Sequence, residues 1–379
     1  MKLLPLFIFW CLWFLNFSTR TVFSPILPLI EDSLSISHGK AGGLYFSLSI
    51  GYALTLILSG RFASVWGYKR TVFVGFMGVG LVLLGFQWVE SYTAFHILFF
   101  FLGIASGAYL PSIIPIITET YDPKHWGKAI GFHDSAASLA IFSSPILVAF
   151  GLHYPSWRNL LLILGIVSFL LPIYFWKVSI EPKHELSTQG NRWSNLFKRK
   201  TIWMSGILWI FASASSMGIY SILPLYLIKE RGISFGLATN LFGISRAGGM
   251  AVPILIGFLI DRYGYRKMLV WGIITTGLST IGLSLASALP FIVIALVLQA
   301  TVSLAFFPIG LASISKLTPL SERAMATGVI ISIGVIFGLG LTPFLLGVVA
   351  DHFNFQTGIL GLGMLTTLSS LMVRFLKDG

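Results

Sequence analysis

Long apolar runs limit what this chain can fold into more than any other feature. Twelve such runs, separated by charged or turn-forming residues, occupy nearly all of the 379 residues. A membrane-spanning helix takes about 20 apolar residues, and lipid-exposed backbone at that depth must be helical because nothing else there satisfies its hydrogen bonds. Only 10% of the residues are charged, against about 25% in a soluble domain. The sequence therefore predicts an all-α membrane protein with 12 transmembrane helices and no separate soluble catalytic domain.

The apolar runs fall into two sets of six. The first set lies near 3–30, 41–60, 71–89, 92–118, 128–151 and 158–176, and the second near 201–228, 236–260, 268–288, 290–315, 324–350 and 357–376. We predict an N-terminal six-helix bundle at 1–176, a basic cytoplasmic linker at 177–200 and a C-terminal six-helix bundle at 201–379. No small-residue cleavage site follows the first run, so we interpret it as a span rather than a signal peptide.

The positive charges indicate an orientation. If Lys2 is cytoplasmic, the loops and tail on its side hold 19 of the 25 basic residues, while four fall on the other side and two within apolar runs. That side also holds seven acids, so it accounts for the whole net charge of +12 as the positive-inside bias of membrane proteins. We predict that both termini are cytoplasmic. Scattered cations of this kind do not suit a nucleic-acid partner.

The two sets of six resemble each other at a nearly fixed offset. A shift of 197 residues superposes Gly60 on Gly257, Gly67 on Gly264, Tyr68 on Tyr265, Lys69 on Arg266, Arg70 on Lys267, Pro111 on Pro308 and Gly131 on Gly328. Such agreement is the mark of an internal repeat. The chain is therefore predicted to consist of two similar bundles.

The loop after the second run of each half carries the most specific motif. In the second half it reads Gly257-Phe-Leu-Ile-Asp261-Arg262-Tyr-Gly264-Tyr-Arg266-Lys267, a full match to G-x-x-x-D-R-x-G-x-R-K. With this motif and the repeat, the whole chain resembles the major facilitator superfamily of secondary transporters. The resemblance implies two six-helix bundles related by pseudo-two-fold symmetry, with a cytoplasmic gate to which the motif belongs.

The first half departs from the motif, because Ser64 and Val65 stand at the Asp and Arg positions. A second family mark in the second half includes the pair Glu322-Arg323, where the first half has His125-Trp126. Topology alone would explain the basic residues, whereas we expect Asp261, at a helix end among cations, to make a gate contact. The resemblance assigns the cytoplasmic gate to Gly60, Gly67, Arg70, Gly257, Asp261, Arg262, Gly264, Arg266, Glu322 and Arg323.

Two arginines lie deep within apolar runs. Arg20 is 11 residues, or about 16 Å of helix, from Glu31, and Arg246 is 15 residues, or about 22 Å, from Asp261. An arginine at such depth costs at least ~2.5 kcal/mol, so it must meet an anion, a carbonyl or water. Asp134 is the only acid that we place well inside a run. The missing counter-charge is therefore predicted to be a carboxylate or phosphate of the substrate. The alternative is that the arginines bond helix carbonyls or lock helices together through Asp134.

Further polar residues complete the predicted site. Asn16 lies one turn before Arg20 on the same helix face. His133 and Asp134 form a titratable pair at the start of the fifth run, for which we predict proton coupling, with a satisfied pair at a helix start as the alternative. Several more side chains are expected to line the cavity, although any single one could serve packing alone: Tyr52, Tyr109, Tyr220 and Gln299.

The stretch from Asn16 to Pro28 resembles the first span of the superfamily's anion:cation symporters, in which an intramembrane arginine binds organic anions. Those relatives often have an acid just before the arginine, where this chain has Thr19. We predict a secondary active transporter that works by alternating access and takes up a small organic anion, a carboxylate or a phosphate-bearing metabolite, with protons. The runner-up is a proton-driven exporter of hydrophobic or cationic drugs. Exporters of that kind usually carry a deep acid in the first or fourth span, where this chain has none.

Other classes fit less well. The sequence has no G-x-x-x-x-G-K-[ST] motif for an ATP-driven pump and no H-E-x-x-H zinc motif. Its one cysteine, Cys11, excludes an internal disulfide and a multi-cysteine cluster. An intramembrane transferase or a channel would leave the duplicated gate motif unexplained. We expect no enzymatic activity, cofactor or metal, and a monomer in a bacterial inner membrane whose partners are the lipid bilayer, an anionic solute and a coupling proton or sodium ion.

Overall fold

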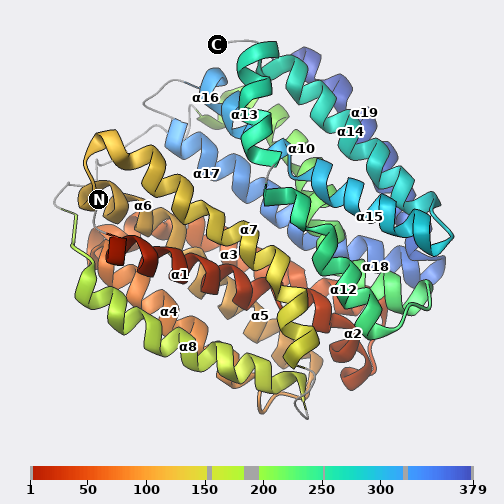
Figure 1. Ribbon diagram of the computed structural model, residues 1–379, viewed down its shortest axis with the longest axis horizontal. Coiled ribbons are helices and arrows are strands. Elements are labelled where there is room, and N and C mark those ends of the chain that lie inside the picture. The colour runs from red at the N-terminus through yellow and green to blue at the C-terminus, as the bar shows by residue number, and fades with distance from the viewer. Residues whose placement is uncertain (1–2, 152–155, 183–195, 251, 319–322, 377–379) are drawn as a thin grey trace. The chain divides into compact units, whose positions relative to one another are not determined.

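The computed structural model describes residues 3–151, 156–182, 196–250, 252–318 and 323–376, and all regular structure in these ranges is helical (Figure 1). The chain divides into two compact units. The first unit contains Met1–Leu34 and Ser47–Thr188, and the second contains Ser35–Phe46 and Gln189–Gly379. Most of the predicted linker, residues 183–195, lies outside the described residues.

The first unit is built from the helices of the first set of apolar runs, together with one short 3-10 turn. Helix α3 begins with residues that belong to the second unit and continues in the first. The elements are α1 (Leu3–Thr21), α2 (Phe23–Leu34), α3 (His38–Trp66), α4 (Tyr68–Gly85), α5 (Tyr92–Gly107), α6 (Tyr109–Thr120), η1 (Pro123–His125), α7 (Trp126–Gly151) and α8 (Trp157–Val178).

The second unit has more interruptions, several of which are π-helical or 3-10 segments. Its elements are α10 (Lys200–Ser213), η2 (Ala214–Gly218), α11 (Ile219–Leu225), η3 (Tyr226–Glu230), α12 (Phe235–Ser245), η4 (Ala247–Met250), α13 (Val252–Tyr263), α14 (Tyr265–Leu285), α15 (Leu289–Ser303), α16 (Phe306–Leu317), α17 (Arg323–Gly334), η5 (Val335–Leu341), α18 (Thr342–His352), α19 (Phe355–Ser369) and η6 (Ser370–Phe375).

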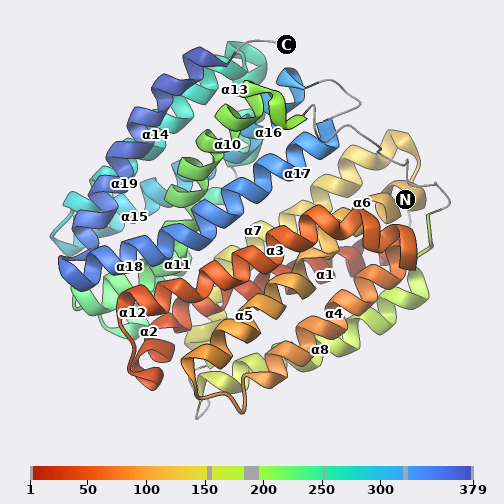
Figure 2. The same cartoon turned by 180° about the vertical axis from the view of Figure 1, so that it is seen from behind.

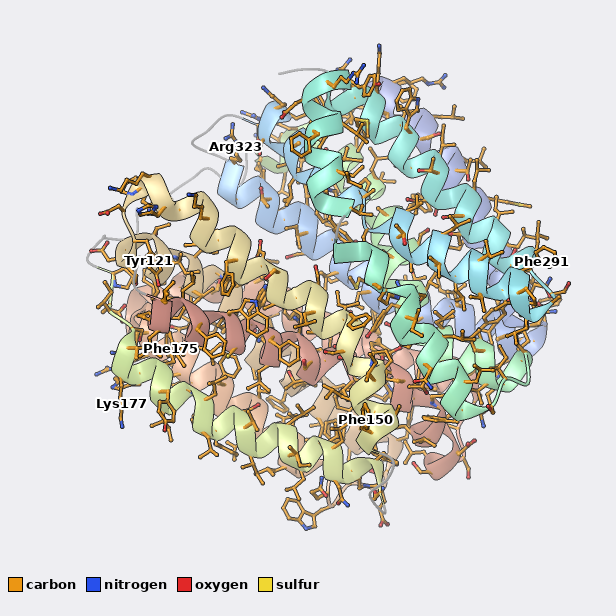
Figure 3. The ribbon with its side chains drawn as sticks, viewed as in Figure 1. Tyr121, Phe150, Phe175, Lys177, Phe291 and Arg323 are labelled. Carbon is orange, nitrogen blue, oxygen red and sulfur yellow. The ribbon has the colours of Figure 1, made fainter. Side chains whose placement is uncertain are left out.

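Eleven continuous helical segments in the described residues are long and apolar enough to cross a membrane. The remaining predicted span, near 236–260, is divided among α12, η4 and α13, and neither of its α-helices has 18 residues. In the described residues, each of the twelve predicted spans therefore contains helix, and the eighth is interrupted close to Arg246. Apolar side chains such as Phe150 and Phe291 project from the surface, as lipid contact requires (Figure 3).

Proline positions explain three of the places where long helices are interrupted. A proline ring inside a helix clashes with the carbonyl four residues earlier and lacks an N–H to donate. Pro25 follows Thr21, the last residue of α1, by four residues, and Pro111 stands in the same relation to Gly107 at the end of α5. Pro308 similarly follows Leu304, at which α15 gives way to α16. These breaks therefore follow from the sequence itself.

Small residues allow the helices within each unit to approach closely. In the first unit, α4 packs along α5 and α8, and α1 packs along α7 (Figure 2). A Cβ atom added to Gly103 of α5 would strike the carbonyl of Leu48 on α3. In the second unit, Gly277 of α14 and Gly363 of α19 face each other's backbone. These contacts are the usual basis of helix association in membranes, where apolar side chains gain little by leaving lipid.

The two motif loops have the same backbone turn. Gly67 between α3 and α4 has φ 81°, and Gly264 between α13 and α14 has φ 80°. The Glu181 carboxylate accepts hydrogen bonds from the backbone N–H groups of Tyr68 (2.6 Å) and Lys69 (3.0 Å) at the start of α4. The N-terminus of α4 is therefore capped by an acid that follows α8 in the chain. The negative charge of this acid offsets the positive end of the helix dipole.

Replacement of Gly264 by alanine should destabilise the fold by about 1–2 kcal/mol, because an L side chain is strained at this positive φ. No atom lies within 4 Å of the added Cβ, so steric contact would not contribute. The matched control is Gly361→Ala within α19, which also has open space and should gain about 0.5–1 kcal/mol. Chemical unfolding of the purified variants measures both values, and equal stability of the two variants would contradict the account.

Candidate functional site

Arg20 is buried in the last turn of α1 and is surrounded by aromatic rings and amide oxygens. Its side chain is 9% exposed. Its Cζ lies 4.6 Å from the ring centres of both Phe17 and Tyr52, the latter on α3. Its Nε donates to the Asn16 carbonyl (3.2 Å) and its Nη2 donates to Asn16 Oδ1 (3.0 Å). Within the described parts of the chain, its contacts include no carboxylate.

Asn16 holds this arrangement in place. It is almost fully buried, and its Nδ2 donates to the carbonyl of Ser106 in the last turn of α5 (3.1 Å). The same amide therefore bonds α5 with its nitrogen and Arg20 with its oxygen. A planar guanidinium held on one edge can present its remaining donors to a ligand in a fixed direction.

Arg246 is the buried arginine of the second unit and lies at the break between α12 and η4. It is 3% exposed, and its Cζ lies 4.9 Å from the ring centre of Tyr220 and 5.3 Å from that of Phe242. Its Nε and Nη2 are buried and have no hydrogen-bond partner among the described residues. Buried polar groups in proteins are nearly always paired. Two unpaired donors on one buried cation therefore mark a site that a ligand can complete.

A third cluster surrounds His133 on α7. His133 is fully buried, and its Nε2 lies 3.0 Å from the hydroxyl of Tyr109, which also donates to the Phe9 carbonyl (2.9 Å). The imidazole stacks on Trp13, with ring centres 5.5 Å apart. On its other side, Nδ1 lies 3.4 Å from a carboxylate oxygen of Asp134, whose side chain is 60% exposed. A proton on this imidazole therefore lies between a buried phenol and an exposed carboxylate.

Helix α1 connects the His133 cluster with the Arg20 cluster. Trp13 stacks on Tyr109 with a centroid distance of 5.2 Å, and its ring meets Phe17 edge-on at 4.7 Å. Phe17 in turn lies under the guanidinium of Arg20. The spacing of these α1 residues, at 13, 17 and 20, places them on one helix face. The two clusters of the first unit are thus in continuous contact.

The residues that the sequence predicts to line one cavity fall into separate groups in the structure. Asn16, Arg20 and Tyr52 come together, and so do Arg246 and Tyr220. Tyr109 lies with His133 instead. Gln299 donates to the Ser215 carbonyl (2.5 Å) and so joins α15 to η2 within the second unit.

Sequence reasoning missed three aromatic residues of the site. Phe17 and Phe242 lie three and four residues before the two buried arginines, and Trp13 lies seven before Arg20. Helical spacing from each arginine would have found all three, since residues three, four or seven apart share a face. The aromatic content of the chain, 15%, hides them among many lipid-facing rings.

The predicted gate residues are distributed over the two loops and the start of α17. Asp261 and Arg262 are exposed at the end of α13, while Arg266 donates to the Tyr265 hydroxyl (3.3 Å) and to the Leu376 carbonyl. Arg323 donates to the Ser315 carbonyl (2.7 Å) and thereby ties α17 to α16 (Figure 3). Glu322 lies outside the described residues, as do the surroundings of Gly60. The gate assignment stays a prediction.

Comparison with known proteins gives the family. The model of the Major Facilitator Superfamily matches residues 9–259 and 235–378, and the chain belongs to this family. The fold is that of the nucleoside transporter NupG, with a TM-score of 0.81, 17% sequence identity, and coverage of 99% of this chain and 99% of that one.

Curated relatives differ in what their names say they transport. The chain is 24% identical to the hexuronate transporter of Bacillus subtilis (strain 168) over 67% of its length. It is 28% identical to the probable sulfoacetate transporter SauU of Cupriavidus necator over 66% of its length. The matched region spans 63% of each of these two relatives. An MFS-type efflux pump of Mycolicibacterium smegmatis is 25% identical over 92% of this chain and 84% of its own.

Replacement of Tyr109 by phenylalanine should destabilise the protein by about 1–3 kcal/mol. The variant keeps the stacked ring but leaves the Phe9 carbonyl and His133 Nε2 without the hydroxyl. Tyr174→Phe on α8 is the control, because that side chain is 62% exposed, and its stability should stay within about 0.5 kcal/mol of wild type. Thermal unfolding in detergent compares the two, and an unchanged Tyr109→Phe protein would show that this hydroxyl does not hold the cluster together.

Proposed function

We propose that this member of the Major Facilitator Superfamily is a proton-coupled carrier that takes up a small organic anion by alternating access. The observation that carries the proposal is Arg246, whose Nε and Nη2 are buried with no partner among the described residues. A buried charge without a partner is costly. A bound carboxylate or phosphate supplies both the charge and the paired acceptor oxygens that a guanidinium fork fits.

Arg20 supports the same solute class from the first unit. Its aromatic neighbours, Phe17 and Tyr52, stabilise the cation through their ring faces but leave its charge uncompensated. Asn16 occupies only one edge of the guanidinium. We therefore assign solute binding to Arg20 and Arg246, with Asn16 as the positioning residue and Tyr52 and Tyr220 as aromatic walls.

Proton coupling is assigned to His133 and Asp134. Histidine is the side chain whose ordinary titration lies nearest neutral pH. In its protonated form the His133 ring can donate from Nε2 to Tyr109 and from Nδ1 towards Asp134. The contacts from Trp13 to Phe17 provide a physical route by which a change at His133 can reach Arg20.

The relatives support the solute class and also define the competing one. Hexuronate and sulfoacetate, named for two relatives, are both organic anions. The relative named as an efflux pump is matched over a larger share of this chain, 92%. Aromatic walls would also suit a hydrophobic or cationic drug. Proton-driven efflux is therefore the competing function, and the experiment below separates the two.

Arg246→Met should abolish stabilisation by an anionic ligand without destabilising the unliganded protein. Replacing an unpaired buried charge by an apolar side chain of similar length removes its desolvation cost, so the free energy of unfolding should stay level or rise by about 1–4 kcal/mol. The measurement is a thermal-shift screen of wild type and variant against small carboxylates, phosphates and organic cations. At 100 times Kd a ligand adds about 2.7 kcal/mol.

Arg374→Ala, which removes an exposed cation near the C-terminus, is the control and should keep the wild-type response. Arg20→Ala, like Arg246→Met, should lose the thermal stabilisation by anionic ligands. Full anion shifts in both variants would contradict the binding role of the arginines. Shifts produced only by organic cations or lipophilic drugs would favour the efflux function.

Asp134→Asn should flatten the pH dependence of solute uptake. In the wild type we expect uptake into proteoliposomes to rise as the outside pH falls, because protonation of the His133–Asp134 pair loads the carrier with its coupling ion. The control is Glu90→Gln in the loop between α4 and α5, an exposed acid outside the cluster. A wild-type pH profile in Asp134→Asn would remove this pair from the coupling mechanism.

A further inference from the structure

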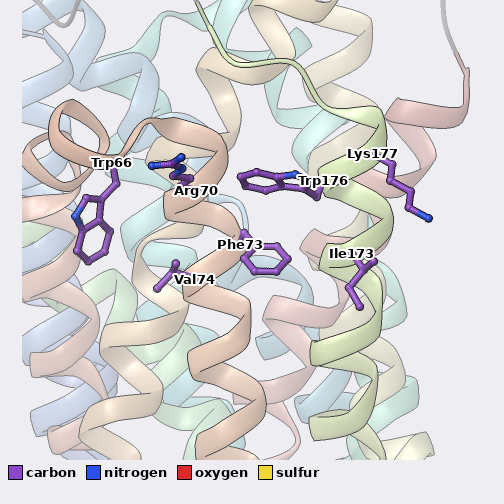
Figure 4. Close-up of a pocket in the computed structure, with 7 residues that line it drawn as sticks. All are labelled: Trp66, Arg70, Phe73, Val74, Ile173, Trp176 and Lys177. Atoms are coloured by element: carbon purple, nitrogen blue, oxygen red, sulfur yellow. The ribbon is translucent and has the colours of Figure 1, made fainter.

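A cavity of about 500 Å³ opens on the first unit at the end that we predict to be cytoplasmic. It lies between the end of α3, the first turns of α4 and the last turns of α8 (Figure 4). Trp66, Phe73 and Trp176 supply its aromatic walls, and Arg70 and Lys177 supply its cations. Tryptophan and lysine or arginine together are typical of the level of the lipid headgroups.

The cations of this cavity are available to a ligand. Arg70 is exposed beside Trp176, and Arg70 has no hydrogen-bond or ion-pair partner in the described parts of the chain (Figure 4). Lys177 is exposed at the end of α8, on the other side of Trp176 from Arg70, and its Nζ lies 5.9 Å from the ring centre of Tyr174 (Figure 4). Glu181, an acid that follows α8, already accepts from two backbone N–H groups at the start of α4.

Lys69 adds to the positive charge. Its Nζ lies 4.7 Å from the ring centre of Trp176 and donates to the Ser179 carbonyl (3.0 Å). Among the described residues that the cavity and the start of α4 bring together, the three cations Lys69, Arg70 and Lys177 outnumber the carboxylate of Glu181, which gives this end of the cavity a net positive charge. An anionic group at headgroup level is the complementary ligand.

An apolar groove continues from the same cavity into the depth of the membrane. A second cavity, of about 380 Å³, shares Trp66 and Val74 with the first and follows α4 and α5. On α4 it is lined at positions 71, 74, 75, 78, 81 and 82, which is one face of a helix. From Arg70 to Val82 the helix rises about 18 Å, slightly more than half of a bilayer core of ~30 Å.

The groove is open to lipid and is not filled by neighbouring side chains. Val74 is 48% exposed and Leu81 is 64% exposed, whereas Gly75 and Gly78 present no side chain. The groove walls are almost entirely apolar, and the groove reaches the cations only at one end. This combination fits a molecule with an anionic head and a long hydrocarbon chain.

We propose that the first unit binds one anionic phospholipid of the surrounding leaflet, with its phosphate group at Arg70, with Lys177 adding positive charge from the other side of Trp176, and with an acyl chain in the groove along α4 and α5 (Figure 4). The internal repeat gives a natural comparison. At an offset of 197, Lys267 and Arg374 repeat the two cations, but Val270 and Val373 replace the aromatic Phe73 and Trp176. Trp66 is matched by another aromatic residue, Tyr263. Two of the three aromatic walls are therefore particular to the first unit, whereas the charges are repeated.

The test measures lipid affinity of the full-length protein in detergent. The protein is titrated with brominated phosphatidylglycerol or brominated phosphatidylcholine, and quenching of tryptophan fluorescence reports binding beside Trp66 and Trp176. We expect phosphatidylglycerol to bind at least tenfold more tightly. Each cation near a lipid headgroup contributes about fivefold, so R70A/K177A should lose most of this preference, while R70K/K177R should keep it.

The matched control is K267A/R374A, which removes the same charge from the repeated positions and should leave the preference within twofold of wild type. Val74→Trp, at an exposed position shared by both cavities, should weaken both lipids similarly by blocking the groove. Glycerol 3-phosphate should not compete at millimolar concentration. Wild-type preference in a folded R70A/K177A protein, or full competition by glycerol 3-phosphate, would overturn the proposal.

Discussion

The structure depends on the cost of keeping a guanidinium group away from water. Arg20 and Arg246 are both buried, and neither contacts a carboxylate in the described residues. Aromatic faces and the Asn16 amide reduce that cost without neutralising the charge. Each arginine also lies next to a helix break, after Thr21 in one case and at the start of η4 in the other. Discontinuous helices at such positions are typical of solute sites in secondary transporters.

Prolines in the sequence explain three of the helix breaks, and glycines form the turns of the two motif loops. Pro25, Pro111 and Pro308 each end a helix four residues earlier, and the same physical rule operates in both halves of the repeat. The paired positive φ values of Gly67 and Gly264 repeat in the same way. The repeat therefore preserves the devices that bend the backbone, while the side chains around them differ between the halves. Glu181 illustrates this difference, because it caps α4 in the half whose loop lacks the motif aspartate.

Much of the fold and part of the site could be predicted from the sequence. Apolar run length predicts the helices because a bilayer leaves the backbone no other choice, and the two arginines are conspicuous because almost nothing else charged lies at that depth. The grouping of Tyr109 with His133 could not be predicted, since it depends on how α6 and α7 pack against α1. Trp13, Phe17 and Phe242 were within reach of helical spacing. The capping role of Glu181 could not be predicted from helical spacing, because the start of α4 lies more than a hundred residues earlier in the chain.

The exposed surface of the first unit shows that lipid contact need not be uniform. Cations and tryptophans on α3, α4 and α8 lie next to an apolar groove along α4 and α5, although the sequence patterns that predict these helices treat the whole outer face as equivalent. The repeat supplies the comparison, since the second half keeps the cations but has valine at two of the three aromatic positions. Phe73 and Trp176, two of the three aromatic residues of the proposed lipid site, therefore stand at positions at which the two halves differ.

The most direct test of the central claim is to give Arg20 a built-in counter-ion. Asn16→Asp places a carboxylate where Asn16 Oδ1 already lies 3.0 Å from Arg20 Nη2, with almost no change of shape. Calorimetric titration with the anion that best stabilises the wild-type protein then measures Kd. If Arg20 recognises the solute through its unpaired charge, affinity should fall at least tenfold while the protein remains folded. Wild-type affinity in folded Asn16→Asp protein would contradict the account.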